Sequence, residues 1–358
     1  MQGVKRPTLL ISKRICVENI AKMEEHARMN QVLFRPHFKT HQSVEIGNWF
    51  RSAGITSITV SSVNMAKFFA EHGWKDMTIA FPVNLLEIDD INELSQRLNL
   101  NLLVDSADTV QFLARNIQHT TGFFIEIDTG NRRTGVEPDD HHTIRHILEK
   151  ASQSHYLRFA GFLTHTGQVY GATHTSEIMQ FHMEAGNALT SLKEEYRSNY
   201  PGLILSTGDT PTCSLFDPYP GIDEIRPGNF VFYDLMQFYI GSCSLENIAI
   251  ALACPVVSVF PERNEAVLYG GSVHLSKEQW STPQGEKFFG MAVALTTDGW
   301  DVNSSLGFIS GLSQEHGILK LQEGIQLSPG ELVAILPVHS CLAMDLMQCK
   351  DDGVRIID

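Results

Sequence analysis

The chain has 358 residues, 43% of them apolar and 19% charged, as is ordinary for a soluble globular protein of one or two domains. Its formal net charge is −14 and its Lys and Arg residues form no block, which argues against a nucleic-acid partner and against an anionic membrane surface. The longest apolar runs, such as residues 248–257, are too short to span a bilayer, and the first residues lack the pattern of a signal peptide.

Eight short strand-like runs fill the first two thirds of the chain, and most are followed by a helical pattern. The runs are residues 33–40, 55–62, 77–83, 99–106, 122–129, 158–165, 203–210 and 224–234. The helical patterns, several of which open with a Ser, Asn or Asp suited to an N-cap, are residues 43–54, 64–74, 86–98, 107–117, 139–153 and 175–199. This alternation predicts a (β/α)8 barrel of the TIM type. A doubly wound sheet is the competitor, but it usually shows an early Gly-rich nucleotide turn, and none follows the first strand.

The pattern changes from about residue 242, where helical periodicity fades and short β-type runs separated by turns take over. These runs are residues 248–260, 265–276, 288–297, 307–313, 317–323, 331–341 and 353–358. They predict a second, mostly antiparallel β domain. Residues 7–16 are also strand-like and could return to that domain. We therefore expect a barrel over residues 14–241 and a β domain built from residues 1–13 and 242–358.

The first barrel strand ends in Lys39, within the sequence FRPHFKTHQ. In a barrel of this type, sites form at the C-terminal ends of the strands. Because side chains alternate along a strand, His37, Lys39 and His41 are expected on one face. Three basic or titratable groups are poor core material, so this face meets either water or an acidic partner. The two histidines and His165 are candidates for lining a site or moving protons, and equally for hydrogen-bonded support.

The loops after the seventh and eighth strands supply Gly, Ser and Thr in tight turns. Such turns expose backbone N–H groups and hydroxyls, which suit a phosphate, and the usual phosphate site of these barrels lies there. The candidates are Gly208, Thr210, Gly228 and Asn229. Taken alone, these turns are explained as well by ordinary loop punctuation.

A phosphate at strands seven and eight, with a lysine across the barrel, suggests pyridoxal phosphate. A lysine amine condenses with its aldehyde to form a Schiff base. For Lys39 alone, an exposed strand lysine is the commoner explanation. Taken together with the other loops, the cofactor is the better interpretation.

Five motifs in order carry a family resemblance: RPHFKTH, EIDTGNRRTG, HTGQVYG, STGDTPT and EIRPGNFVFYD. Over nearly the whole chain, the sequence resembles the D-threonine aldolase and D-serine dehydratase group of alanine-racemase-like, fold-type III pyridoxal-phosphate enzymes. The resemblance implies a barrel plus a β domain, and dimers whose sites lie near the subunit interface. It implies that Lys39 is the Schiff-base lysine and that Arg133 contacts the phenolic oxygen of the cofactor. It also implies that Tyr170 meets the pyridine nitrogen, while the four turn residues hold the phosphate.

A second candidate site is the sequence LPVHSCLAMDL, in which His339 and Cys341 are two residues apart on a strand-like run. Imidazole and thiolate suit zinc, but two ligands leave water or substrate to complete the shell. From the spacing alone, a buried cysteine beside a satisfied histidine explains the pattern better. The resemblance favours a metal, because D-serine dehydratases of this group carry a His-x-Cys zinc pair, whereas D-threonine aldolases more often carry His-x-Asp with other divalent ions. Val338 and His274 depart from the group's usual sequence.

These observations favour a lyase that acts on D-3-hydroxy amino acids, with zinc before manganese as the metal. Dehydration would give a 2-oxo acid and ammonia, and a retro-aldol reaction would give glycine and an aldehyde. Serine, threonine and 3-hydroxyaspartate all stay open as substrates. An amino-acid racemase would need a second base, for which the β domain offers only Tyr269 as a tyrosine. A non-catalytic pyridoxal-phosphate carrier would lack the second domain, and a barrel without cofactor would make the five motifs a coincidence.

The six cysteines form no C-x-x-C pair and no framework. They predict free, reduced thiols and therefore a cytoplasmic protein.

Overall fold

The computed structural model describes residues 3–172, 174–217, 219–281 and 285–358. The chain forms two compact units, one from Lys22–Gly228 and one from Met1–Ala21 together with Asn229–Asp358. The predicted boundaries lay near residues 13 and 241. Residues 229–241, which were predicted to belong to the barrel, are part of the other unit. Within that unit, the Asn19 side-chain amide donates to the backbone oxygens of Asn247 (2.9 Å) and Val231 (3.4 Å). This joins the start of the first helix to residues 229–247.

The first unit contains a parallel sheet of eight strands, in the order β2-β9-β8-β7-β6-β5-β4-β3, among the residues that the structure describes. The strands are β2 (Leu33–Phe34), β3 (Ser57–Val60), β4 (Asp76–Pro82), β5 (Asn99–Val104), β6 (Thr121–Glu126), β7 (Leu157–Leu163), β8 (Ile204–Thr207) and β9 (Glu224–Ile225). Each corresponds to one predicted run. The sheet nearly closes into a barrel, because Phe38 donates to the Thr59 carbonyl (2.8 Å) and Thr59 donates to the Pro36 carbonyl (2.9 Å). The predicted barrel is confirmed.

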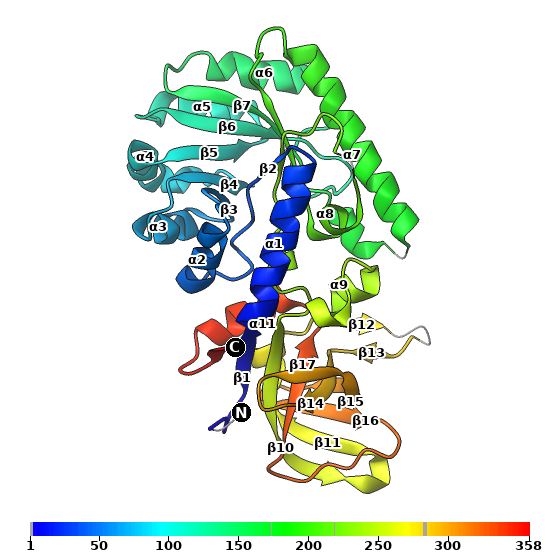
Figure 1. Cartoon of the computed structure of the whole chain (residues 1–358). Helices are drawn as coiled ribbons and strands as arrows, with labels where there is room; N and C mark the ends of the chain where they lie inside the picture. Colours follow the sequence, from blue (N-terminus) through cyan, green and yellow to red (C-terminus); the bar gives the residue numbers. More distant parts are fainter. Residues whose placement is uncertain (1–2, 173, 218, 282–284) are drawn as a thin grey trace. The chain divides into compact units, whose positions relative to one another are not determined.

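The six predicted helices follow their strands, and Figure 1 shows α3 to α6 on the outside of the sheet. They are α2 (Val44–Ser52), α3 (Val63–Glu71), α4 (Ile88–Arg97), α5 (Ala107–Asn116), α6 (His141–Ala151) and α7 (Thr175–Tyr196). Three begin at a serine N-cap whose hydroxyl accepts a backbone N–H of the first turn, namely Ser43, Ser62 and Ser106. The sequence did not predict α1 (Lys13–Met29), α8 (Thr210–Leu215), α9 (Leu235–Ile240), α10 (Ser272–Leu275) or α11 (Ser340–Gln348).

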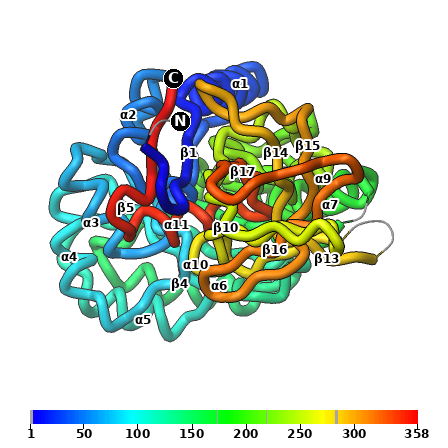
Figure 2. The backbone as a smooth tube through the Cα atoms, turned by 90° about the horizontal axis from the view of Figure 1, so that it is seen from below, coloured from blue at the N-terminus to red at the C-terminus, as the bar shows by residue number. Residues whose placement is uncertain are grey.

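The second unit is a mostly antiparallel sheet in the order β11-β16-β15-β14-β17-β10-β1-β18, with β10 also paired to β11. Its strands are β1 (Thr8–Ser12), β10 (Ile250–Phe260), β11 (Glu265–Tyr269), β14 (Gly290–Leu295), β15 (Trp300–Leu312), β16 (His316–Leu321), β17 (Leu332–Pro337) and β18 (Val354–Ile357). The N-terminal strand does return to this unit, since β1 is antiparallel to β10 and parallel to β18. The N-terminal strand β1 and the C-terminal strand β18 accordingly lie side by side (Figure 2).

The described helices include none with the length and apolar character that crossing a membrane requires.

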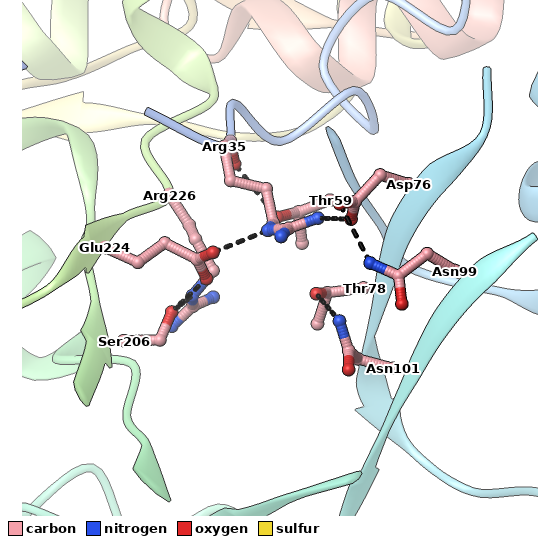
Figure 3. A network of polar contacts seen from close by, with 9 residues as sticks. All are labelled: Arg35, Thr59, Asp76, Thr78, Asn99, Asn101, Ser206, Glu224 and Arg226. Atoms are coloured by element: carbon pink, nitrogen blue, oxygen red, sulfur yellow. Dashed lines mark hydrogen bonds and ion pairs between the residues drawn. The ribbon is translucent and has the colours of Figure 1, made fainter. Parts of the chain in front are cut away.

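A network of polar side chains, most of them buried, joins strands of the barrel unit (Figure 3). The Arg35 guanidinium donates to Glu224 Oε2 (2.6 Å) and also pairs with Asp76. The Arg226 guanidinium donates to Ser206 Oγ (2.7 Å) and to the backbone carbonyl of Thr164, the residue after β7 (2.6 Å). Because each buried charge has partners, the network fixes the ends of β8 and β9, and removing one partner would leave a charge uncompensated.

Candidate active site

Lys39 lies in a turn after β2, and the predicted strand over residues 33–40 is wrong beyond Phe34. Pro36 has no N–H to donate to a ladder, which favours the end of the strand there. Phe38 then turns inward and is fully buried, whereas Lys39 is exposed. The predicted alternation, which put His37, Lys39 and His41 on one face, therefore does not hold.

His41 belongs to the core of the barrel unit. Its ring stacks on Phe50 at 5.6 Å and meets Phe38 edge-on at 4.4 Å between centroids. Its Nδ1 accepts a hydrogen bond from the Ser43 backbone N–H (3.0 Å). Burial lowers the pKa of His41 to about 3, so the ring is neutral and acts as packing and support.

His37 and His165 lie instead beside the predicted cofactor residues. Burial, followed by the charges of Lys39 and Arg226, lowers the pKa of His37 well below its ordinary value. Burial, then Lys39, Arg133 and Arg226, lowers the pKa of His165 to about 3. Charged groups from the ends of β2, β6 and β9 thus act on the histidines that follow β2 and β7. The cations are Lys39, Arg133 and Arg226, and the two histidines are neutral. A site with this charge is suited to an anionic ligand.

The two glycines predicted to hold phosphate lie where strand ends approach each other closely. Gly208 has φ +134°, and a Cβ there would lie 2.6 Å from the Arg226 nitrogen. A Cβ on Gly228 would lie 2.8 Å from the His37 oxygen. The close approach of backbones therefore requires glycine at both positions, whatever binds above them.

Thr210 and Tyr170 lie together in the same unit. Thr210 is buried and begins α8, and its N–H donates to the Tyr170 hydroxyl at 3.4 Å. Tyr170 comes from the short 3-10 helix η2 (Gly167–Gly171), and its ring centroid is 6.3 Å from that of His165. The phenol predicted to meet the pyridine ring is thus next to a residue predicted to bind phosphate.

Asn229, also predicted for phosphate, directs its side chain to a different set of groups. Its Nδ2 lies 2.7 Å from Asp234 Oδ2, 3.0 Å from Ser340 Oγ and 3.6 Å from Cys341 Sγ. Its Oδ1 is buried and has no hydrogen-bond partner among the described residues. The amide therefore accompanies the predicted metal ligand Cys341.

His339 and Cys341 lie at a strand-to-helix junction, and the prediction that both are on a strand is wrong. β17 ends at Pro337, His339 is the N-cap residue of α11, and Cys341 is in its first turn. The two side chains still meet. Burial lowers the pKa of His339, but the hydrogen bond with Cys341 and the charges of Cys341 and Asp234 raise it to about 9.

The junction fits a metal with imidazole and thiolate ligands. His339 Nδ1 is buried without a hydrogen bond in the described part of the chain, and it lies 3.7 Å from Asp234 Oδ2. A carboxylate behind an imidazole is the usual device that orients a metal-bound histidine. The described residues contain no group of three or more His, Cys, Asp or Glu side chains that could hold a metal ion. Water or substrate would therefore complete the coordination shell, as in an open catalytic site.

Asp234 was not predicted as a site residue, although it ends the motif EIRPGNFVFYD. It is fully buried, and it organises two helices at once. Its Oδ1 accepts the Gln237 N–H of α9 (3.0 Å), and its Oδ2 accepts the Ser340 N–H of α11 (2.9 Å). Asp234 and Ser340 are 106 residues apart in the sequence, and the fold brings them together. Residue spacing therefore does not indicate that Asp234 links the starts of α9 and α11.

Comparison with known families decides the affiliation of the chain. The family profile described as "Alanine racemase, N-terminal domain" matches residues 11–235. The chain belongs to the alanine racemase N-terminal domain family. Within this family, the remainder of the chain also has a counterpart, because the profile "Putative serine dehydratase domain" matches residues 249–349.

The relatives of this family member that align over nearly the whole chain include two dehydratases. The D-serine dehydratase of Dictyostelium discoideum is 29% identical over 96% of this chain and 91% of its own. The D-threo-3-hydroxyaspartate dehydratase of Delftia sp. strain HT23 is 29% identical over 94% of this chain and 90% of its own. The resemblance inferred from the five motifs is confirmed.

Solved structures agree with this placement in the alanine racemase N-terminal domain family. The Delftia enzyme superposes with a TM-score of 0.88 at 27% identity, covering 96% of this chain and 93% of that one. A cysteine-to-alanine mutant of that enzyme is described as being in the metal-free form. D-threonine aldolase from Filomicrobium marinum shares the fold, with a TM-score of 0.80 at 19% identity over 95% of this chain and 91% of that one.

Proposed function

We propose that the chain is a pyridoxal-phosphate- and divalent-metal-dependent lyase of the D-serine dehydratase type. It removes water from a D-3-hydroxy amino acid and releases ammonia and a 2-oxo acid. The observation that carries the proposal is the His339–Cys341 pair backed by the buried Asp234, in a chain whose barrel presents Lys39 among cations. Dehydratases that align with over nine tenths of the chain support the same reaction class.

The barrel residues would hold the cofactor and handle the proton. Lys39 would bind its aldehyde carbon, Arg133 its phenolic oxygen, and the turns at Gly208, Thr210 and Gly228 its phosphate. When bound, pyridoxal phosphate withdraws electrons from the substrate α-carbon. With the cofactor bound, Lys39 Nζ would accept the α-proton of the substrate. The neutral His37 and His165 beside it add no further positive charge to the site.

The junction residues would hold the metal. His339 and Cys341 would bind the ion, whose Lewis acidity eases departure of the substrate hydroxyl. Asp234 would keep the imidazole in its ligating orientation. The thiolate favours zinc over manganese, because soft sulfur ligands select zinc while manganese prefers oxygen ligands.

The alternative is D-threonine aldolase activity, in which the bond between the α- and β-carbons breaks instead. Cysteine at position 341 favours the dehydratase, and the aldolase neighbour is more distant. A racemase is disfavoured. Its required second base would have to be Tyr269, whose ring lies edge-on against His274 at 5.8 Å between centroids.

The reaction is tested by identifying products. The purified chain is incubated with pyridoxal phosphate and D-serine, D-threonine or D-threo-3-hydroxyaspartate, with and without a chelator. Ammonia with pyruvate, 2-oxobutanoate or oxaloacetate, lost on chelation, is the expected result. Glycine with an aldehyde would establish the aldolase, and an inverted enantiomer without other products would refute both.

We also propose that the enzyme is a cytoplasmic homodimer. The resemblance supports the dimer, which sedimentation tests. None of the six cysteines, all of them among the described residues, forms a disulfide bond, which supports a reducing compartment.

A further inference from the structure

Asn229 has a buried side-chain amide whose two ends are unequally satisfied. The residue is 6% exposed, and its Nδ2 has three polar neighbours. Its Oδ1 has no hydrogen-bond partner among the residues that the structure describes. An unpartnered buried acceptor destabilises a fold, and such groups are rare in native proteins. The amide therefore lowers stability at its oxygen end, and the role of its N–H groups requires an explanation.

The closest neighbour of the Asn229 amide determines its direction. Nδ2 lies 2.7 Å from Asp234 Oδ2, and a carboxylate only accepts hydrogen bonds. The nitrogen of the amide must therefore face Asp234. The same carboxylate oxygen also accepts the Ser340 backbone N–H (2.9 Å) and the Ser340 hydroxyl (3.1 Å). Since the hydroxyl hydrogen of Ser340 is directed at Asp234, its oxygen is left as an acceptor for Asn229.

The second N–H group of Asn229 is directed at the first turn of α11. Its acceptors there are Ser340 Oγ at 3.0 Å and Cys341 Sγ at 3.6 Å from Nδ2. A neutral thiol is a weak acceptor, whereas hydrogen bonds to ionised acceptors are roughly twice as strong as neutral ones. The thiolate is also the form of cysteine that binds a metal. The contact between the amide and the sulfur therefore strengthens when Cys341 takes its ligating form.

We propose that Asn229 is a positioning residue for Cys341: its Nδ2 donates a hydrogen bond to the sulfur and holds the thiolate in the direction in which it binds a divalent metal. Asp234 fixes the amide from its other N–H group. The inference rests on the proposed function, in which His339 and Cys341 hold the metal. It differs from the prediction made from the sequence, because the side chain of Asn229 serves the metal and only its backbone remains for the phosphate.

The test uses cobalt(II) as the probe, because its absorption band for charge transfer from sulfur reports on the thiolate directly. The band is recorded on the full chain with pyridoxal phosphate bound, as the difference between cobalt(II)- and zinc(II)-loaded samples, so that the absorption of the cofactor cancels. Asn229→Ala should weaken cobalt(II) binding about 10- to 100-fold, the range typical of residues that support a metal ligand. The band should move to longer wavelength, because a thiolate that loses a hydrogen bond gives up its electrons more easily.

Asn19→Ala is the matched control. Asn19 is a buried asparagine of the same unit, 3% exposed, and its amide donates to the backbone oxygens of Val231 and Asn247. Its replacement removes the same atoms from a similar environment. We expect the cobalt(II) affinity and the sulfur band of Asn19→Ala to equal those of the wild type.

Two further measurements separate this role from those of neighbouring groups. Asp234→Asn acts on the imidazole of His339, so it should weaken cobalt(II) binding without moving the sulfur band. The dissociation constant of pyridoxal phosphate, measured by fluorescence titration, should be the same in Asn229→Ala and wild type, because the backbone of the turn is unchanged.

Unchanged cobalt(II) affinity in Asn229→Ala, or weaker binding without a shift of the sulfur band, would overturn the inference while leaving the proposed function standing. A loss of pyridoxal-phosphate affinity as large as the loss of cobalt(II) affinity would do the same. A wild-type chain that binds neither zinc(II) nor cobalt(II) would overturn both. If Asn229→Ala does not fold, as judged by circular dichroism, Asn229→Ser replaces it. Its hydroxyl ends one bond short of the Nδ2 position, so the same weakening and the same band shift are expected.

Discussion

His339 Nδ1 lies 3.7 Å from Asp234 Oδ2, and the aspartate is completely buried. The distance suits an ion pair and exceeds a normal hydrogen bond. The same carboxylate receives backbone N–H groups from the first turns of α9 and α11. One side chain therefore combines the capping of two helices with the orientation of a predicted metal ligand.

Replacing Asp234 should separate these two roles. Asp234→Asn keeps an acceptor oxygen but loses the charge, so metal affinity should fall about 10- to 100-fold with the fold retained. Asp234→Ala should in addition lower the free energy of unfolding by about 2 kcal/mol, because two helix starts lose their acceptor. Metal affinity is measured by competition with a chelator, and unfolding by urea titration.

Asp140 provides the control for the Asp234 variants. It caps α6 in the barrel unit by accepting the Thr143 N–H at 3.0 Å. Asp140→Ala should lower stability by about 1 kcal/mol and leave metal affinity unchanged. Equal metal affinity in Asp234→Asn and wild type would rule out the orienting role.

Cys341→Ser should remove the bound metal and with it the lyase activity, because a hydroxyl is a poor zinc ligand compared with a thiolate. We expect at least a 100-fold drop in kcat, roughly the scale of an electrostatic stabiliser lost from a site. Cofactor absorbance should stay, since Lys39 is unchanged. Cys349, exposed at the other end of α11, is the matched control. Full activity in Cys341→Ser, or equal loss in Cys349→Ser, would contradict the assignment.

Gly208→Ala and Gly228→Ala should each destabilise the barrel unit. Gly208 combines φ +134° with a Cβ contact of 2.6 Å, so we expect a loss of about 2 kcal/mol or more. Gly228→Ala should cost about 1–3 kcal/mol through overpacking against His37. Gly186, within α7, has open space around its Cβ position, and Gly186→Ala should stabilise the chain by about 0.5–1 kcal/mol. Urea unfolding measures all three, and neutral effects at both strand ends would show that the close approaches are not needed.

His41 should make the stability of the chain depend on pH. Its pKa is about 3 in the folded state and 6.5 ordinarily, so its contribution is present above pH 6.5 and is lost as the pH falls toward 3. Between pH 7 and pH 5 this one group should lower the free energy of unfolding by about 2 kcal/mol. His41→Phe should reduce the measured difference between the two pH values by that amount. An unchanged pH dependence would show that the ring is not held neutral.

The sequence predicts both the barrel and the antiparallel β unit, because the two differ in the spacing of their apolar residues. Strand and helix alternate up to about residue 241, and short β runs replace them afterwards. Even the return of β1 to the second unit follows from its run of apolar residues, all buried. The helix α1 was missed because charged residues are spread along its length and it begins directly where β1 ends, without a separating turn.

The sites were harder to predict, because their geometry depends on where strands end. Apolar and β-prone residues continue beyond Phe34, where β2 ends, and beyond Pro337, where β17 ends. The sequence pattern therefore predicts strand for residues that form a turn in the first case and the start of a helix in the second. His41 was consequently assigned to the site face although it packs in the core. Asp234 escaped notice for another reason. Its partner Ser340 is brought close by tertiary contacts, which local residue spacing does not indicate.

The central claim is that the amine of Lys39 binds pyridoxal phosphate covalently. The direct measurement is borohydride reduction of the cofactor-loaded chain, followed by peptide mass spectrometry, with Lys39→Ala and the exposed-lysine control Lys75→Ala in parallel. We predict a pyridoxyl group on the peptide that contains Lys39, in wild type and Lys75→Ala but not in Lys39→Ala. An unmodified wild-type chain, or the group on another lysine, would contradict the account.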